Sequence, residues 1–536
     1  MTSSPTPLRR RRSRAAGPIA AVAVGALALA ACSSGTSAGS TTAAAAPTDK
    51  VLHLSFLQDP GQPPDPDIYY AGQGLLLTTN LYEGLLAYKP GVAKPQIVPS
   101  LAQSWTVSAD KKTYTFTLRK GVTFHDGTPF TAAAVKASFD RRLKVNQGPA
   151  YMVSDVASVT AAGDDKVTIV LKDSNTVFLD FLASAYGPKM FSPTGLKANA
   201  GSDDAQTYLR THDLGTGPYT LTAAAVGSKY ELKAYAGYWG AKPYFTTVQI
   251  PVITDSSSQQ LQFDKGELAA ILHDLPTTAV ASYLKKDTIS AYSLPTLMSD
   301  YLYVNPNTPF GKVPANRMAL LKAVDRATIF KQAYAGRGKV AESAYPANMV
   351  TPGTAPQNVT FDSGVLKGLA GTLPADQKTI TVGYDTSSPD NQLVANLMGA
   401  QLTGNGLTVK VQGFTTSQIF GWVGNVAGAP DVLATLGWPD AAAPYTWGHI
   451  TWDKDAGLNY LHCSDETVTS QLASGLAAGD PTAFSTAGSG AIATGCWLNL
   501  VDQNDFVVAQ KWLKGVEQAH VVTQPNTLSI AALSAG

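Results

Sequence analysis

The chain has 536 residues, of which 44% are hydrophobic and 15% are charged, a composition typical of a globular protein. This length is too great for one ordinary hydrophobic core, so we expect two or more lobes. Without residues 1–31, which hold five arginines and no acidic residue, the chain carries 35 basic and 39 acidic residues, and this formal charge of −4 argues against nucleic acid as a partner.

The first predicted element is an apolar segment from Pro18 to Ala31, which follows a run of arginines at positions 9–12. Its 14 residues are too few to cross a bilayer core, for which a helix needs roughly 20 residues. The segment is therefore typical of the core of a signal peptide, which we assign to residues 1–31. The rest of the sequence holds no second run that could span a membrane.

The signal segment ends in Leu29-Ala30-Ala31-Cys32, which resembles the lipobox of bacterial lipoproteins. The resemblance implies cleavage before Cys32 and acylation of its thiol, so we expect lipid anchoring on the extracytoplasmic face of the cell membrane. A cleaved signal with an unmodified cysteine is the alternative, and the arginine run leaves both general secretory and twin-arginine export open. Residues 32–49 are small and largely polar, which predicts a flexible tether with a reach of roughly 20 to 25 Å.

With Cys32 assigned to lipid, the remaining cysteines are Cys463 and Cys496. An even pair in an oxidising extracytoplasmic compartment predicts a disulfide, and two free buried thiols are the alternative. A metal site built from His449, His462 and Cys463 has no compact ligand spacing behind it. We therefore expect neither a metal nor another cofactor.

The body of the chain mixes strand and helix patterns. Alternation of apolar and polar residues and β-branched content predict strands over 51–56, 113–118 and 166–171. Thr131 is a candidate N-cap for a helix over 132–143, and Pro314 precedes a helix over 315–335. In the second half, strands over 378–384 and 407–413 bracket a helix over 391–402, which predicts a βαβ unit. This mixture indicates an α/β, or mixed α+β, chain with several sheets.

Several motifs in this order resemble the bacterial extracellular solute-binding proteins of family 5, the peptide and nickel group that serves ABC importers. The most distinctive is the run YTFTLRKGVTFHDGTPFTA over 114–132. The other matching motifs are LYEGL at 81–85, PSLAQSW at 99–105, GTGPY at 215–219, YWGAKPY at 238–244, GEL at 266–268 and the segment 305–334.

The resemblance implies a type II periplasmic-binding-protein fold, with two lobes joined by a hinge and one extra domain. By this analogy, domain I takes residues 50–90, 214–300 and 505–536, domain II takes 91–213, and domain III takes 301–504. We expect a monomer in which a ligand binds between domains I and III and closes them about the crossing strands.

In family members that bind peptides, an aspartate neutralises the free ammonium group of the ligand. The segment that ends in Gly437 and Trp438 resembles the strand that leads to this site, which makes Asp440 the candidate aspartate. Only Pro439 separates Trp438 from Asp440, whereas two residues are expected there in peptide binders. Gly437, Trp438 and Trp447 are the further candidate ligand contacts, although tryptophans also pack in cores.

Two other motifs are interpreted as structural. His125 and Asp126 precede Gly127, and an Asp-Gly pair favours a turn over a catalytic base with its orienting acid. The Gly215-Thr216-Gly217 run lacks the lysine of a phosphate loop and is better explained as a crossing between lobes.

We therefore expect a solute receptor that delivers a ligand to an ABC transporter permease, with oligopeptides as the first ligand class. Charged residues are sparse between 413 and 452, which favours cationic or neutral solutes. A metallophore, a sugar or another small molecule is the alternative ligand, and a ligand sensor is the alternative role. A secreted hydrolase is disfavoured, because no Gly-x-Ser-x-Gly motif stands in a convincing context with a histidine and an acid, so no catalytic residue is expected.

Overall fold

The computed structural model describes residues 44–350, 358–387, 389–454 and 456–536. Residues 43–536 form one compact unit. The expected signal peptide, the lipidated Cys32 and the first part of the tether lie outside the described residues. In the part of the chain that is described, no helix has the length and apolar content needed to cross a membrane.

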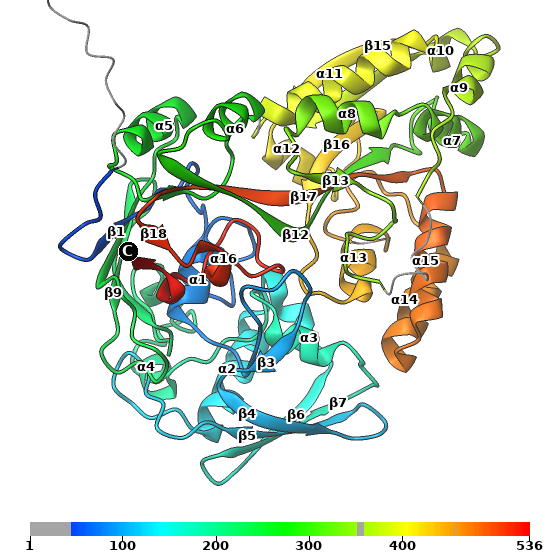
Figure 1. Cartoon of the computed structure of the whole chain (residues 1–536). Coiled ribbons are helices and arrows are strands. Elements are labelled where there is room, and N and C mark those ends of the chain that lie inside the picture. The colour runs from blue at the N-terminus through cyan, green and yellow to red at the C-terminus, as the bar shows by residue number, and fades with distance from the viewer. Residues whose placement is uncertain (1–43, 351–357, 388, 455) are drawn as a thin grey trace, which may run out of the picture. The chain divides into compact units, whose positions relative to one another are not determined.

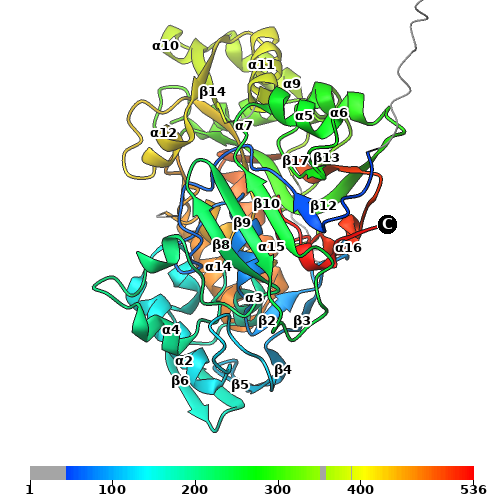
Figure 2. The same cartoon turned by 90° about the vertical axis from the view of Figure 1, so that its left-hand side faces the viewer.

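A four-stranded sheet carries the beginning of the folded chain. Its order is β1 (Val51–His53), β10 (Thr247–Pro251), β9 (Lys229–Ala234) and β8 (Tyr219–Ala225). β1 pairs in parallel with β10, and the other neighbours are antiparallel, as Figure 2 shows for β8 to β10. Leu52, Val248 and Leu232 point into a core shared with α1 (Leu75–Leu81) and α16 (Val516–Ala519).

A second four-stranded sheet is entirely antiparallel and lies within the expected domain II. Its order is β4 (Ala102–Val107), β5 (Thr113–Leu118), β7 (Lys166–Leu171) and β6 (Val156–Ala162). Tyr114, Phe116 and Leu118 are buried on one face of β5, because successive side chains of a strand alternate between faces. They pack against α2 (Ala132–Val145) and α3 (Phe178–Ala183). The strands expected at 113–118 and 166–171 are confirmed.

The largest sheet has seven strands. Its order is β11 (Ala270–Ile271), β17 (Trp497–Gln510), β12 (Ile289–Val304), β16 (Val432–Gly437), β14 (Thr379–Asp385) and β15 (Thr408–Phe414), with β13 (Gly338–Val340) paired to β17. β14 and β15 are parallel and joined by α11 (Pro389–Gly404), which confirms the predicted βαβ unit.

The helices of the second half differ from the sequence prediction in one place. The single helix expected over 315–335 is two helices, α7 (Pro314–Lys322) and α8 (Arg326–Ala333). Asp325 starts the second helix, because its side chain accepts a hydrogen bond from the backbone N–H of Thr328 at 3.1 Å. Thr131 does precede α2, but its side chain forms no capping hydrogen bond within the described residues.

The remaining elements surround these sheets. The helices are α4 (Pro193–Ala198), α5 (Ser256–Asp264), α6 (Thr277–Tyr283), α9 (Ser363–Ala370), α10 (Ala375–Lys378), α12 (Thr416–Gly421), α13 (Pro444–Thr451), α14 (Glu466–Ala478) and α15 (Pro481–Ala493). Two short antiparallel pairs complete the fold: β2 (Leu86–Tyr88) with β3 (Ile97–Pro99), and β18 (Leu513–Lys514) with β19 (Ser534–Ala535).

The long strands β12 and β17 connect the part of the fold with α5 and α6 to the part with α7 to α11 (Figure 1). They pair antiparallel from Ile289 opposite Gln510 to Tyr303 opposite Trp497. Their register shifts between Pro295 and Met298 and again between Asp300 and Tyr301. The domain boundaries expected at 300/301 and 504/505 fall within these two strands.

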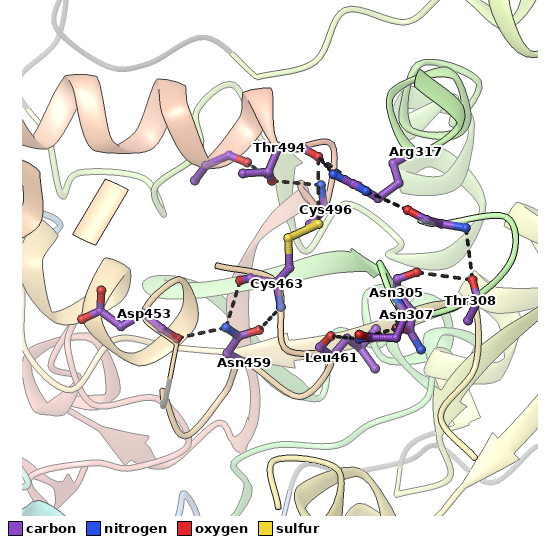
Figure 3. Close-up of a disulfide and its surroundings, with 12 residues drawn as sticks. Asn305, Asn307, Thr308, Arg317, Asp453, Asn459, Leu461, Cys463, Thr494 and Cys496 are labelled. Atoms are coloured by element: carbon purple, nitrogen blue, oxygen red, sulfur yellow. Dashed lines mark hydrogen bonds between the residues drawn. A yellow bond between two sulfur atoms is a disulfide. The ribbon is translucent and has the colours of Figure 1, made fainter. Parts of the chain in front are cut away.

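Cys463 and Cys496 form a disulfide with an S–S distance of 2.09 Å, in agreement with the expected pairing (Figure 3). It ties the loop before α14 to the residue that precedes β17. Asn459 holds this loop, because its side-chain amide donates to the carbonyl oxygens of Asp453 and Cys463, both at 2.9 Å. Because Cys463 is paired with Cys496, neither cysteine is a free thiol, and Cys463 is not available as a metal ligand.

Candidate ligand-binding site

A cavity of about 1230 Å³ lies where the crossing strands meet the loops on both sides. Residues of the expected domains I and II, such as Tyr70 and Tyr151, form one wall, and residues of the expected domain III, such as Trp438 and Asp440, form the other. This volume is somewhat above that of ordinary small-molecule sites, which are roughly 300 to 1,000 Å³. The cavity is therefore large enough for a short peptide or a solute of similar size.

Asp440 is held across this cavity by two tyrosines from the opposite wall. The Tyr151 hydroxyl donates to Oδ2 of Asp440 at 2.6 Å, and the Tyr70 hydroxyl donates to the same oxygen. Tyr70 precedes α1, and Tyr151 lies in a 3₁₀ turn at Gly148–Val153, so segments far apart in the sequence converge on one carboxylate. The backbone carbonyl of Asp440 accepts a further hydrogen bond from the Ser184 hydroxyl.

The Asp440 side chain is in a poor environment for a negative charge. The residue is 6% exposed, and burial raises the pKa of its carboxyl to about 6, against the lowering effect of the Tyr151 and Tyr70 hydroxyls. Its described partners are neutral hydroxyl groups, and His449 acts only through space. A cationic group at this position would neutralise the buried carboxylate and lower its pKa.

Trp438 lies in the cavity wall, directly after β16. Its indole N–H donates to the Tyr186 hydroxyl at 3.1 Å, and its ring packs on Gly72. The backbone can pass this close to Tyr301 only with a glycine at position 437, because a Cβ atom at Gly437 would lie 2.7 Å from the hydroxyl oxygen of the buried Tyr301. The structure therefore places the candidate residues Gly437, Trp438 and Asp440 together in the cavity wall.

Trp447 lies in the hydrophobic core instead. It is 1% exposed, its ring meets Tyr301 edge-on at 5.3 Å, and its indole N–H donates to the carbonyl oxygen of Ala344 at 3.2 Å. This position favours a packing role for Trp447 over the ligand contact expected from the sequence. The pattern of the sequence did not separate the two tryptophans, although Trp438 directly follows β16 and Trp447 lies within α13.

The cavity also contains acidic residues that sequence reasoning did not single out. Asp300 lies on β12 and Asp505 on β17, both at less than 8% exposure. Burial raises the pKa of each carboxyl to about 7. The sequence did not reveal these two residues, because each is a single polar residue in a long strand and belongs to no recognisable motif. Only the tertiary fold makes these strands part of the cavity wall.

The residues considered for metal or acid–base chemistry have structural partners. His449 Nδ1 lies 2.8 Å from Asp453 Oδ2, and His462 Nε2 lies 2.8 Å from the carbonyl oxygen of Trp422. His125 is buried between Asp213 and the carbonyl oxygen of Gly217, which supports its structural interpretation. Among the described residues, no group of three or more His, Cys, Asp or Glu side chains is placed to hold a metal ion.

Comparison with known proteins identifies similar chains. The model of the bacterial extracellular solute-binding proteins, family 5 Middle, matches residues 96–459. The probable D,D-dipeptide-binding periplasmic protein DdpA of Escherichia coli (strain K12) is 29% identical over 448 residues, which cover 82% of this chain and 85% of that protein. The dipeptide-binding protein of the same strain is 31% identical over 314 residues, covering 54% of this chain and 57% of that protein.

Solved structures show the same fold. A periplasmic binding protein DppA from Helicobacter pylori, in complex with the peptide STSA, is 20% identical and covers 90% of this chain and 98% of its own, with a TM-score of 0.77. NikA from Brucella suis, in complex with Fe(III)-EDTA, is 23% identical and covers 91% of this chain and 100% of its own, with a TM-score of 0.78. The expected fold of a two-lobed, type II periplasmic binding protein is confirmed.

Proposed function

Because the chain belongs to the bacterial extracellular solute-binding proteins of family 5, we propose that it is the receptor of an ABC importer and that its first class of ligand is oligopeptides. The observation that carries this proposal is the cavity with Asp440 in its wall. Binding, rather than catalysis, is the function of its relatives, which are binding proteins by name.

The peptide assignment rests on the chemistry of Asp440. A peptide with a free N-terminus must bury an ammonium group, and burial without a carboxylate partner is costly. Asp440 is buried, and its hydrogen-bond partners among the described residues are the neutral hydroxyls of Tyr151 and Tyr70. Trp438 lies beside it in the cavity wall, and its ring can pack against an apolar side chain. The ammonium group would take the place of one or both tyrosine hydroxyls on Asp440.

We further propose that the protein works from the membrane surface. The lipobox-like sequence at Cys32 and the tether of residues 32–49 support a lipid-anchored receptor outside the cytoplasmic membrane. Metabolic labelling with an alkyne fatty acid tests this. We expect label on the wild type and none on Cys32→Ala, together with transfer of that variant from the membrane fraction to the soluble fraction.

The domain boundaries also belong to the proposal. Domains I (50–90, 214–300 and 505–536) and III (301–504) would move about β12 and β17, with domain II (91–213) attached to the first lobe. The register shifts at Pro295–Met298 and Asp300–Tyr301 support a hinge there, since irregular pairing concentrates backbone adjustment in a few residues.

Native mass spectrometry of the protein without residues 1–31 tests the ligand class. We expect a series of peptide masses to leave the wild-type protein on activation and to be absent from Asp440→Ala. Tyr70→Phe is the matched control, because it keeps the carboxylate and removes only one hydroxyl. A single non-peptide mass that is insensitive to Asp440→Ala would leave the receptor role and exclude the peptide assignment.

A further inference from the structure

The charges in the cavity wall are strongly unbalanced. Arg337 and Lys454 are the only lysine or arginine residues in the described wall. Seven aspartates line it: Asp274, Asp300, Asp385, Asp390, Asp440, Asp453 and Asp505. Most of these aspartates have a structural partner, so the excess alone does not define a ligand. The Thr416 hydroxyl, for example, lies 2.9 Å from both carboxylate oxygens of Asp385 and donates to them.

Asp300 is different, because one of its carboxylate oxygens has no hydrogen-bond partner in the described part of the chain, although the Tyr334 hydroxyl interacts with the carboxylate. The residue is 7% exposed and lines the cavity, and its Oδ2 atom has no hydrogen-bond partner among the described residues. A buried carboxylate oxygen without a partner is costly and therefore uncommon in folded proteins. Asp300 lines the cavity, but this oxygen is itself covered in the structure, so a ligand group reaches it only when neighbouring side chains move.

Arg337 forms no ion pair with Asp300, although its positive charge lowers the pKa of the Asp300 carboxyl. Its Nη2 atom donates to Asp390 at 2.6 Å and to the Thr277 hydroxyl at 2.8 Å. Its Nε atom donates to the carbonyl oxygen of Tyr334 at 3.0 Å. Arg337 therefore holds the wall together, and the described structure contains no ion pair to Asp300.

Asp300 and Asp440 are within reach of one short ligand. Asp300 pairs in register with Leu436 of β16, four residues before Asp440. Four residues of chain span at most about 14 Å, so with the strand spacing of about 5 Å the two Cα atoms are less than roughly 20 Å apart. An extended peptide rises about 3.4 Å per residue, and a lysine side chain adds further reach.

We propose that this cavity selects solutes with two cationic groups, one held by Asp440 and the other by Asp300. The inference rests on the proposed function, since it takes this cavity as the solute site. Two sources share this chemistry: a peptide with a free N-terminus and a basic side chain, and an aliphatic polyamine. A peptide with only one ammonium group leaves the Asp300 oxygen unsatisfied, which is the physical basis of the selection.

Isothermal titration at pH 8 with Ala-Ala-Ala, Ala-Lys-Ala, Ala-Ala-Lys and spermidine tests the proposal. Residues 43–536 form one compact unit, so the protein without residues 1–31 is suitable. We expect a lysine peptide to bind at least about tenfold more tightly than Ala-Ala-Ala, the gain of one charge-assisted hydrogen bond. Asp300→Asn should abolish this difference.

Asp140→Asn is the matched control for the loss of one negative charge. Asp140 is exposed on α2, where it pairs with Lys136 at 2.6 Å, and it is not part of the described wall. We expect this variant to keep the full preference for lysine peptides. Loss of the preference in Asp140→Asn as well would show a net-charge effect and overturn the role of Asp300.

A pH series on the wild type gives a second measurement that needs no variant. Tyr334, Arg337 and Asp390 are the charged or titratable groups that act on Asp300, while its register partners on β16 and β17, Leu436 and Val501, are apolar. The ratio of the lysine-peptide affinity to the Ala-Ala-Ala affinity should fall toward one between pH 8 and pH 5, as Asp300 is protonated. The Asp440 contribution is common to both peptides and cancels in this ratio.

The outcomes separate this inference from the proposed function. Equal affinity for Ala-Ala-Ala and both lysine peptides would overturn the proposal that Asp300 binds a second cationic group. A pH-independent ratio of lysine-peptide affinity to Ala-Ala-Ala affinity would overturn it as well. Neither result would contradict the proposed function as a peptide receptor. Binding of spermidine without binding of any peptide would support the dicationic selection and overturn the peptide assignment. No binding of any of these solutes would overturn both.

Discussion

At the scale of single residues, Asp440 combines a cost in stability with its proposed role in binding. Burial raises the pKa of its carboxyl to about 6, so the folded protein binds this proton more tightly than the unfolded chain, in which an aspartate titrates near about 4. The contribution of Asp440 to the free energy of unfolding is therefore highest below about pH 4 and decreases as the pH rises to about 6. Above that pH the ionised carboxylate destabilises the ligand-free protein.

We therefore predict that Asp440→Asn stabilises the ligand-free protein at pH 8 by about 2 to 3 kcal/mol, since one pKa unit corresponds to about 1.4 kcal/mol. The asparagine oxygen can still accept from Tyr70 and Tyr151, while no charge remains to be buried. Urea unfolding at pH 8 and pH 4 measures this, and the gain should vanish at pH 4. The same variant should lose ligand-induced stabilisation. Equal stability of both proteins at pH 8 would contradict the raised pKa.

Gly437 is required by space rather than by backbone conformation. A Cβ atom there would lie 2.7 Å from the hydroxyl oxygen and 2.8 Å from a ring carbon of Tyr301, which is 2% exposed and cannot move easily. We predict that Gly437→Ala destabilises the protein by about 1 to 3 kcal/mol, as overpacking does, and weakens binding through Trp438.

Gly368→Ala is the matched control for this prediction, because a Cβ atom there meets nothing within 4 Å and the residue lies inside α9. It should be neutral or stabilising by about 0.5 to 1 kcal/mol. Thermal unfolding of both variants gives the comparison. A neutral Gly437→Ala would show that Tyr301 can move aside.

At the scale of elements, the Cys463–Cys496 disulfide closes a loop of 33 residues that contains α14 and α15. Chain entropy gives about 3 to 4 kcal/mol of stabilisation for a loop of this length. We predict that Cys463→Ala/Cys496→Ala lowers the free energy of unfolding by about this amount. Addition of dithiothreitol should destabilise the wild type alone. If dithiothreitol destabilised the double variant as much as the wild type, the result would contradict stabilisation by this disulfide.

The sequence predicted the strands over 113–118 and 166–171 with their observed bounds, because one face of each is buried, whereas the strand expected over 51–56 ends at His53. In β5, the buried positions Tyr114, Phe116 and Leu118 alternate with threonines, and the observed bounds are those expected. The break between α7 and α8 was missed because apolar periodicity continues across it. The capping pattern of Asp325 with Thr328 was a usable local signal.

The site was predictable only in part for a related reason. Gly437, Trp438 and Asp440 lie within four consecutive residues, so a resemblance over one segment was enough to select them as candidates. Asp300 and the tyrosines that hold Asp440 come from β12, the segment before α1 and the Gly148–Val153 turn. These residues come together only in the tertiary fold, so no local sequence pattern predicts that they share one site.

At the scale of the whole molecule, contacts far from the crossing strands also join the expected domains II and III. The backbone N–H of Thr176 donates to the carbonyl oxygen of Leu476 at 3.0 Å, near the end of α14. The Ser174 hydroxyl donates to the carbonyl oxygen of Ala477 at 2.6 Å. A hinge motion about β12 and β17 that separates the lobes would break these contacts.

The variant Thr176→Cys/Gly479→Cys tests whether ligand exchange needs this separation. A Cβ atom at Gly479 would lie 3.4 Å from the Cβ atom of Thr176, close to the 3.5 to 4.5 Å of disulfides. We predict that oxidation after loading slows ligand release at least about tenfold in stopped-flow displacement, and that dithiothreitol restores the wild-type rate. Thr176→Cys alone should release ligand normally, because it cannot form the bond. Release at the wild-type rate from the oxidised double variant would mean that the ligand leaves without separation of these two domains, and the proposed hinge would then have no role in exchange.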